Sequence, residues 1–115
     1  MDAILEKLGQ ATGVIGCFIT GMDGLVVAGT MREGREIDLL AATVADLYHN
    51  VQEAFQSMDG SLPELVTIER PSEKVFIQYI EGADTLLVVL TVPKVNLGLV
   101  RMEIQQAAQK LKSQL

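Results

Sequence analysis

The sequence predicts a single α/β (α+β) domain, residues 1–115, whose central strand is covered above and below. Hydrophobic residues make up 49% of the chain and aromatic residues only 4%, and this aliphatic excess suits strands that are buried on both faces. The run TLLVVLTV, residues 85–92, predicts such a strand. Between residues 37 and 58, apolar side chains recur every three or four positions, which predicts one long amphipathic helix.

The first half of the chain predicts a short helix, a β-hairpin and the long helix. Apolar residues at helical spacing place the short helix near residues 3–8, and a glycine ends it. The stretch VIGCFIT (14–20) predicts a strand and LVVAGT (25–30) its return, because the Asp-Gly pair between them favours a hairpin turn. A polar loop, MREGRE, then leads into the long helix.

The second half predicts three strands and a closing helix. ELVTIE (64–69), KVFIQYI (74–80) and TLLVVLTV are separated by short turns, so neighbouring strands should be antiparallel. The long helix is then the crossover between the hairpin and these strands. TLLVVLTV is apolar on both sides, so it should be the central strand. Asn96 is well placed to cap the closing helix.

Charge and composition exclude several classes of function. The net charge is −6, and nine basic residues are scattered among fifteen acidic ones, which argues against nucleic acid and against anionic membrane surfaces as ligands. The longest apolar run is far too short to span a bilayer, and the N-terminus lacks the features of a signal peptide. A single cysteine, Cys17, cannot form an internal disulfide. We therefore expect a cytoplasmic protein without direct membrane insertion.

The sequence contains no recognisable catalytic, cofactor or metal site. The glycine-rich stretch 12–30 matches neither a dinucleotide-binding motif nor a P-loop, so its glycines are expected to serve turns and packing. Cys17 is expected to be a buried, inert thiol, and His49 a solvated or interface residue. Arg32 and Arg35 leave two interpretations open: an arginine finger donated to a partner's nucleotide, or a solvated loop.

Three stretches resemble the Roadblock/dynein light chain family over essentially the whole chain. They are the hairpin GVIGCFITGMDGLVVAGT, the strand TLLVVLTV and the closing stretch NLGLVRMEIQQAAQKL, which is similar to the closing motif of the family. The resemblance implies a three-layer α/β/α sandwich with a mainly antiparallel five-stranded sheet in the order 2-1-5-4-3. The first and last helices would cover one face of this sheet, and the long helix the other.

The same resemblance assigns a packing role to the closing helix. Leu97, Val100 and Ile104 would pack on the sheet. Gly98 and the Ala107/Ala108 pair would permit close approach of backbone and of the first helix.

Members of the family form dimers, so the resemblance implies a homodimer with a continuous ten-stranded sheet. In it, the strand near residues 64–69 would pair with its own copy, and the two long helices would pack together. The expected dimer interface consists of Leu65, Val66, Thr67 and Ile68 on the strand and Tyr48, Val51 and Phe55 on the helix.

Function also follows from the resemblance. The family binds and regulates small Ras-like GTPases or serves as adaptors, and stand-alone prokaryotic members resemble the gliding-motility (Mgl-type) GTPase partner. The leading hypothesis is therefore a homodimeric, non-enzymatic regulator that binds a small Ras-like GTPase and stimulates its GTP hydrolysis, with no cofactor of its own. Two alternatives stay open: a dimeric adaptor in a motor or signalling assembly, and a small-ligand sensor. The residues expected to dock the GTPase are Asp46, His49, Asn50, Glu53, Arg32 and Arg35.

Overall fold

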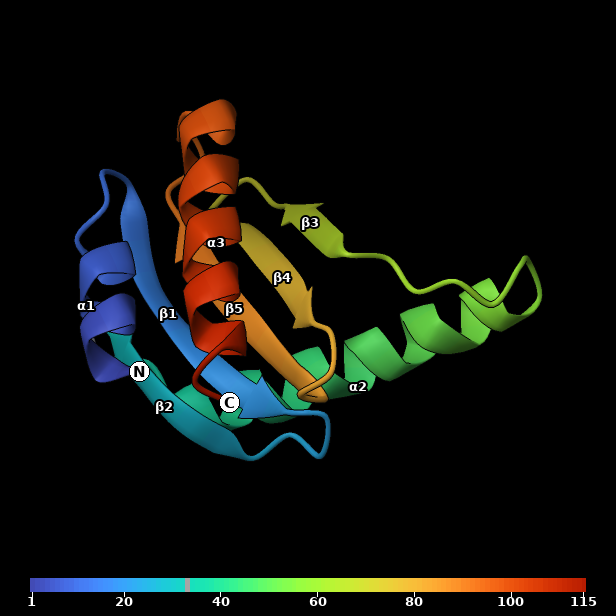
Figure 1. Cartoon of the computed structure of the whole chain (residues 1–115). Coiled ribbons are helices and arrows are strands. Elements are labelled where there is room, and N and C mark those ends of the chain that lie inside the picture. Colours follow the sequence, from blue (N-terminus) through green and yellow to red (C-terminus); the bar gives the residue numbers. More distant parts are fainter. Residues whose placement is uncertain (33) are drawn as a thin grey trace.

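A computed structural model of the protein describes residues 1–32 and 34–115, so Glu33 in the predicted polar loop lies outside the described residues. The helices and strands follow one another along the chain in the predicted order (Figure 1). They are α1 (Asp2–Gly9), β1 (Val14–Gly21), β2 (Val26–Met31), α2 (Ile37–Gln56), β3 (Leu65–Glu69), β4 (Lys74–Ile80), β5 (Thr85–Thr91) and α3 (Leu97–Lys112).

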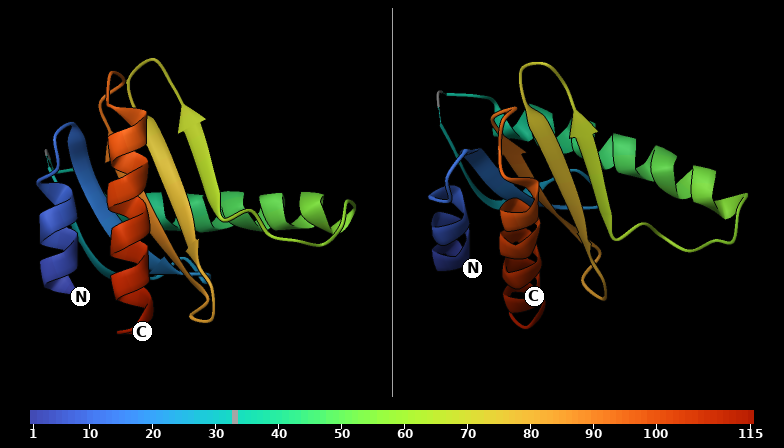
Figure 2. Two further views of the ribbon diagram at one scale, coloured as in Figure 1. Left: turned by 45° about the horizontal axis from the view of Figure 1, so that its top comes forward. Right: turned by 90° about the horizontal axis from the view of Figure 1, so that it is seen from above.

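The five strands form one antiparallel sheet in the order β2-β1-β5-β4-β3, as predicted. All residues of β5 are buried, which confirms that the strand apolar on both sides occupies the centre of the sheet. α1 and α3 lie on one face of the sheet and α2 crosses the other (Figures 1 and 2). The chain therefore has the predicted three-layer α/β/α architecture.

Each face of the sheet carries its own hydrophobic core. On one face, Leu5 and Leu8 of α1 and the buried stripe of α3 cover β1, β4 and β5. On the other face, Ala41, Val44 and Tyr48 of α2 cover the opposite sides of the same strands. Because side chains alternate along a strand, β5 contributes to both cores.

Cys17 lies in the core beneath α1. It is fully buried, and its Sγ atom lies 3.3 Å from the carbonyl oxygen of Leu5. Burial raises the pKa of the Cys17 thiol to about 11, which disfavours the reactive thiolate at neutral pH. The prediction of a buried thiol is confirmed.

The closing helix differs from its prediction in the first turn. Asn96 caps α3 by accepting a hydrogen bond from the backbone N–H of Leu99 at 3.0 Å, and Val100 and Ile104 are buried as predicted. Leu97, however, is 36% exposed, and a Cβ atom added at Gly98 would contact only the Asn96 side chain, at 3.6 Å. The packing roles predicted for Leu97 and Gly98 are therefore wrong, since the helix becomes buried only from Val100 onward.

Substitutions at two glycines test how closely other atoms approach each position. At Gly29, a Cβ atom would lie 2.6 Å from the Cβ of Phe18 and 2.5 Å from Ile37, so Gly29→Ala should destabilise the fold by about 1–3 kcal/mol. The matched control, Gly98→Ala, should stabilise it by up to about 1 kcal/mol, because alanine favours the helix and its Cβ makes only an ordinary van der Waals contact with Asn96, at 3.6 Å. Urea unfolding curves of the two variants measure both effects, and equal destabilisation would contradict this assignment.

Candidate functional site

The open edge of the sheet at β3 is the first part of the candidate site. β3 is the last strand of the sheet and pairs with β4, so half of its backbone N–H and C=O groups have no ladder partner among the described residues. The predicted residues Leu65, Val66, Thr67 and Ile68 are all half-buried. Val66 and Ile68 face the α2 side and Leu65 faces the α3 side, so β3 offers apolar surface on both faces.

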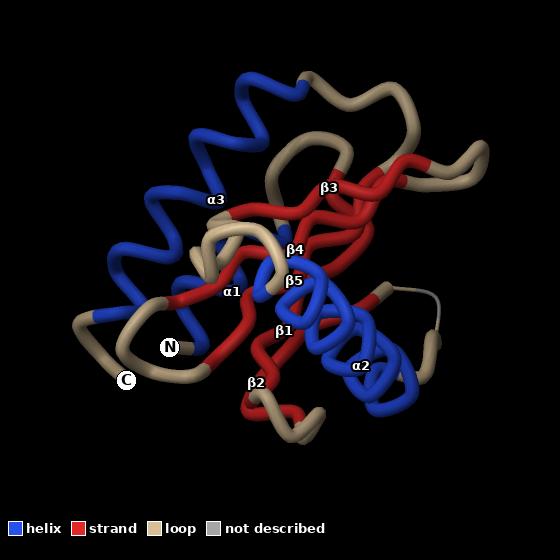
Figure 3. Tube along the Cα trace, turned by 90° about the vertical axis from the view of Figure 1, so that its right-hand side faces the viewer, coloured by secondary structure: helices blue, strands red, loops and turns tan. Residues whose placement is uncertain are grey.

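The second half of α2 extends past this edge. In Figures 1 and 2, α2 runs beyond β3, and Figure 3 looks onto β3 and α2 from that side. The buried residues of α2 end at Tyr48. Val51 and Phe55 follow three and seven residues later, on the same helical stripe, and both are half-buried. The apolar stripe of α2 therefore continues where the sheet no longer covers it.

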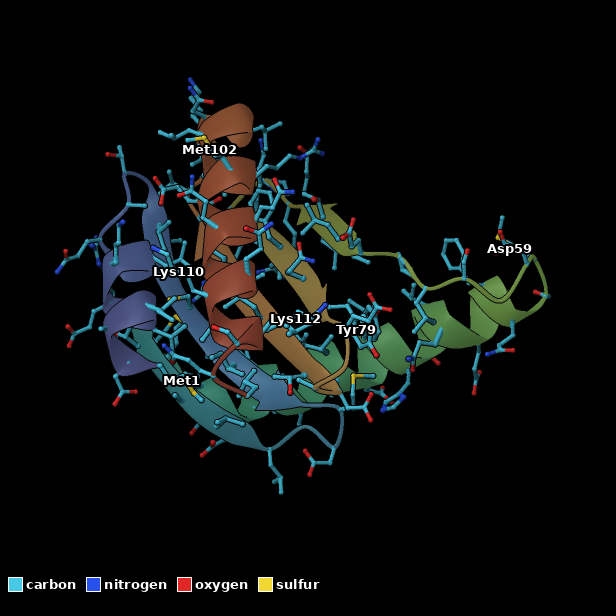
Figure 4. All side chains as sticks on the ribbon, in the orientation of Figure 1. Met1, Asp59, Tyr79, Met102, Lys110 and Lys112 are labelled. Carbon is cyan, nitrogen blue, oxygen red and sulfur yellow. The ribbon has the colours of Figure 1, made fainter. Side chains whose placement is uncertain are left out.

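Tyr48 has a different position from the one predicted. It is fully buried, its ring stacks on that of Tyr79 with centroids 5.7 Å apart, and its hydroxyl donates a hydrogen bond of 3.0 Å to the carbonyl oxygen of Pro63. Burial, with a smaller effect of Tyr79, raises the pKa of Tyr48 to about 12. Figure 4 shows Tyr79 next to α2. Tyr48 thus fixes the segment between α2 and β3. Because it is fully buried, its own side chain offers no surface to a partner.

The predicted docking residues of α2 share one exposed side of the helix. Asp46, Asn50 and Glu53 are spaced by four and three residues, and all are exposed. The Nε2 atom of His49 lies 2.8 Å from the carbonyl oxygen of Met22 in the β1–β2 turn. Since a carbonyl only accepts, this nitrogen donates the hydrogen bond. His49 therefore ties the hairpin to an otherwise acidic helix face.

The two predicted arginines have structural partners. Arg35 Nη1 lies 2.6 Å from Oε2 of Glu73, and Arg70 binds the other oxygen of the same carboxylate. Arg32 Nη2 lies 3.4 Å from the carbonyl oxygen of Gly9, at the C-terminal end of α1. Arg35 is thus not a free finger: it is an exposed loop residue whose guanidinium forms part of a clasp between the β2–α2 and β3–β4 connections.

Glu73 was not indicated by the sequence, because no periodicity or motif marks a buried carboxylate in a turn. Its side chain is only 4% exposed. Burial by itself would raise its pKa, but the hydrogen bonds and charges of Arg35 and Arg70 outweigh that effect and hold the pKa of Glu73 below its ordinary value of 4.5. The Arg35–Glu73–Arg70 clasp therefore keeps a charged carboxylate inside the protein.

A groove beside α3 carries charges of both signs and no marked reactive group. A groove of about 660 Å³ lies between α3 and the β3–β4 pair, and it is lined by charges of both signs, including Glu64, Glu81, Arg101 and Lys112. Within residues 1–32 and 34–115, no group of three His, Cys, Asp or Glu residues could hold a metal ion. In the same residues, no helix has the length and hydropathy of a membrane span.

Comparison with known proteins identifies relatives of the whole chain. No protein-family model matches the chain. The uncharacterized protein MJ0714 of Methanocaldococcus jannaschii is 31% identical over 113 residues, which cover 98% of this chain and 94% of that protein. The uncharacterized protein MJ1340 of the same organism is 29% identical over 113 residues, covering 98% of this chain and 97% of that protein.

Solved structures share the fold. The Roadblock/LC7 domain from Streptomyces avermitilis matches with a TM-score of 0.90 and 21% identity, over 98% of this chain and 95% of that one. Myxococcus xanthus MglB matches with a TM-score of 0.90 and 18% identity, over 96% and 90%. LokiProfilin2, from a complex with rabbit actin, matches with a TM-score of 0.69 and 15% identity, over 99% and 96%. These likenesses confirm the predicted resemblance in fold.

The clasp makes stability depend on pH through Glu73. Because the folded-state pKa lies below 4.5, the charged carboxylate stabilises the fold above pH 4.5, and this contribution is lost as pH falls through the folded pKa. Glu73→Gln should therefore cost about 2 kcal/mol at neutral pH, and the difference from the wild type should shrink below pH 4.5. Denaturant unfolding at several pH values measures this difference.

The exposed carboxylate Glu69 provides the control for this experiment. It is 61% exposed and lies 3.4 Å from Lys74, so Glu69→Gln should change stability by no more than about 0.5 kcal/mol at any pH. A Glu73→Gln variant as stable as this control would show that the clasp contributes nothing.

Proposed function

The chain belongs to one family with MJ0714 and has the Roadblock/LC7 fold, and from this premise we propose that it is a homodimeric regulator of a small Ras-like GTPase. In this proposal the protein binds the GTPase through its surface and stimulates GTP hydrolysis without performing the chemistry itself. The observation that carries the proposal is the continuity between the uncovered edge of β3 and the apolar stripe of α2 that runs past it.

A second copy satisfies both features at once. An antiparallel β3–β3 contact supplies ladder partners for the outer N–H and C=O groups of Leu65–Glu69. It also brings the two protruding ends of α2 together, so Val51 and Phe55 are covered by their symmetry-related counterparts. The proposed dimer seam therefore consists of Leu65, Val66, Thr67 and Ile68 on β3 and Val51 and Phe55 on α2.

The GTPase is placed on the acidic face of α2, formed by Asp46, His49, Asn50 and Glu53. Asp46 and Glu53 are exposed and give this face negative charge, which suits basic residues around a nucleotide-binding site. Arg35 is held by Glu73, so no arginine finger from that position is required by the proposal. The regulator would act by repositioning groups of the GTPase.

A dimeric adaptor without effect on nucleotide turnover is the second candidate. It is favoured by the breadth of the fold, since LokiProfilin2 shares it and is seen with actin. A ligand sensor is less well supported, because the groove beside α3 is lined by charges of both signs and contains one aromatic residue, Tyr79. The two leading candidates differ in one measurable quantity, the rate of GTP hydrolysis by the partner.

The decisive experiment is single-turnover GTP hydrolysis by a small Ras-like GTPase encoded in the same genome, with and without this protein. We expect faster hydrolysis and a stable complex on gel filtration. A complex without acceleration would establish the adaptor, and the absence of both for every small GTPase of the organism would refute the proposal.

The dimer seam predicts the effect of a buried charge. Ile68→Asp should convert the dimer to monomer or aggregate, because it places an unpaired carboxylate at the seam, on the side of β3 that faces α2. Val27 lies on the opposite sheet edge, in β2, and is 53% exposed, so Val27→Asp should leave the dimer intact. Light scattering coupled to gel filtration measures both masses. A dimeric Ile68→Asp variant would exclude this seam.

The acidic face predicts a charge-reversal effect on the partner. The double variant Asp46→Lys/Glu53→Lys should slow association with the GTPase about tenfold or more at low salt, because attraction becomes repulsion. The control Asp2→Lys/Glu6→Lys reverses the same number of charges on α1, at the other face of the sheet. Stopped-flow association rates compare the two. Equal slowing of association by both variants would show that net charge, and not the acidic face of α2, determines the rate.

A further inference from the structure

The sheet has a second open edge, at β2, which the proposed dimer leaves uncovered. Among the described residues, β2 pairs with β1 alone. The backbone N–H of Arg32 donates a hydrogen bond of 3.3 Å to the carbonyl oxygen of Ile15, beside β1. Because alternate residues of a strand direct their backbone groups to opposite sides, the N–H and C=O groups of Gly29 and Met31 point away from β1. This edge therefore offers hydrogen bonds to another extended chain.

A β-bulge limits the length of β2 that can pair. The register between β1 and β2 shifts between Ile19 and Thr20, which leaves Val27 as the extra residue of β2. A bulge distorts the ladder locally, so the regular part of the edge runs from Ala28 to Met31. A partner at this edge is therefore a short segment and not a long strand.

Carboxylates of α1 stand beside this edge. α1 covers the β2 side of the sheet and α3 the β4 side (Figure 1), and a Cβ atom added at Gly9 would lie 3.2 Å from the side chain of Thr30 in β2. Lys7 lies on the flank of α1 that lines a groove with α3. Asp2 and Glu6 are exposed and lie on the other flank, which is turned toward the β2 edge.

Further carboxylates lie near the edge on the opposite face of the sheet and at one end. α2 begins next to β2, since a Cβ atom added at Gly29 would lie 2.5 Å from the side chain of Ile37. Glu36 and Asp38, on either side of Ile37, are exposed, as is Asp23 in the β1–β2 turn. Carboxylates thus lie on both sides of this edge.

The basic residues near β2 lie at its C-terminal end. Arg35 is held by the carboxylate of Glu73. Arg32 follows β2 directly, and its Nη2 atom lies 3.4 Å from the carbonyl oxygen of Gly9. The rest of the edge is therefore a region of negative charge, and it favours a positively charged ligand.

We propose that the β2 edge binds a short, basic, extended segment of a partner protein, which adds a strand to the sheet. Asp2 and Glu6 are one helical turn apart, about 6 Å, and alternate residues of a strand are about 7 Å apart. Lysines at alternate positions of the segment therefore meet both carboxylates. The residues between them face the α2 side, where Met31 and Ile37 are half-buried, and are apolar.

A second copy of the chain fits this edge less well than a basic segment does. A twofold β2–β2 contact would place the two α1 helices side by side on one face, so that Asp2 and Glu6 of each copy oppose those of the other. The bulges at Val27 would leave only residues 28–31 of each strand to pair. The proposed site is therefore separate from the dimer seam, and its occupancy does not depend on the GTPase.

The test uses the full ¹⁵N-labelled chain and a short synthetic peptide in which lysine and valine alternate. We expect binding that weakens with added NaCl and slows amide hydrogen exchange of Gly29 and Met31 about tenfold or more, because their N–H groups become ladder donors. Two further peptides are N-methylated, one on its valines and the other on its lysines. Only one of these should bind, because alternate residues direct their backbone groups to opposite sides.

Charge variants test the contribution of α1. Asp2→Lys/Glu6→Lys should weaken binding of the unmodified peptide about tenfold or more. Asp46→Lys/Glu53→Lys makes the same change in net charge on α2 and should leave the affinity unchanged.

Four results would overturn the proposal. The first is equal affinity of the two double variants, with circular dichroism showing both folded. The second is binding of both N-methylated peptides, which would reduce the contact to electrostatic attraction. The third is slowed exchange at Leu65 and Thr67, which would place the peptide on the β3 edge. The fourth is exchange at Gly29 and Met31 that slows with protein concentration when no peptide is present, which would assign the edge to a second copy.

Discussion

Burial of β5 on both faces is the constraint on which the rest of the structure depends. A strand whose residues are all buried requires helices above and below it, and α1, α2 and α3 of the described residues provide them. α1 and α3 together cover one face, while α2 alone covers the other. α2 runs past the β3 edge of the sheet (Figure 2), and its half-buried residues Val51 and Phe55 lie in that protruding half. The surfaces available for partners are thus a consequence of how the core is closed.

The buried polar side chains form hydrogen bonds with other parts of the fold. We therefore assign the function to surfaces and not to a buried site. Glu73 is held by two arginines, the Tyr48 hydroxyl by Pro63 and the Cys17 thiol by Leu5. Among the described residues, each buried side-chain nitrogen or oxygen has a hydrogen-bond partner. A catalytic site usually keeps a perturbed group free to react. Here Glu73, Tyr48 and Cys17, whose pKa values are shifted, form hydrogen bonds that join separate segments of the chain.

The sequence predicted what depends on local periodicity and missed what depends on distant segments. Element order, the central place of β5 and the buried stripe from Val100 onward follow from patterns within each segment. The clasp joins Arg35 to Glu73, 38 residues apart, and no local pattern records such a pair. Leu97 continued the apolar period of α3, but periodicity does not show where the sheet beneath a helix ends. Tyr48 was likewise placed on the correct stripe but at the wrong depth.

Dimerisation would give the assembly two copies of the acidic α2 face. A twofold axis at β3 gives the assembly two acidic α2 faces, one on each protomer. A partner that carries two basic patches could then bind at two points, and the second contact would benefit from a high effective concentration. Such a partner would bind the dimer more tightly than either surface alone allows. Because this gain needs both sites at a fixed separation, the rigid pairing at β3 would set the specificity of the assembly.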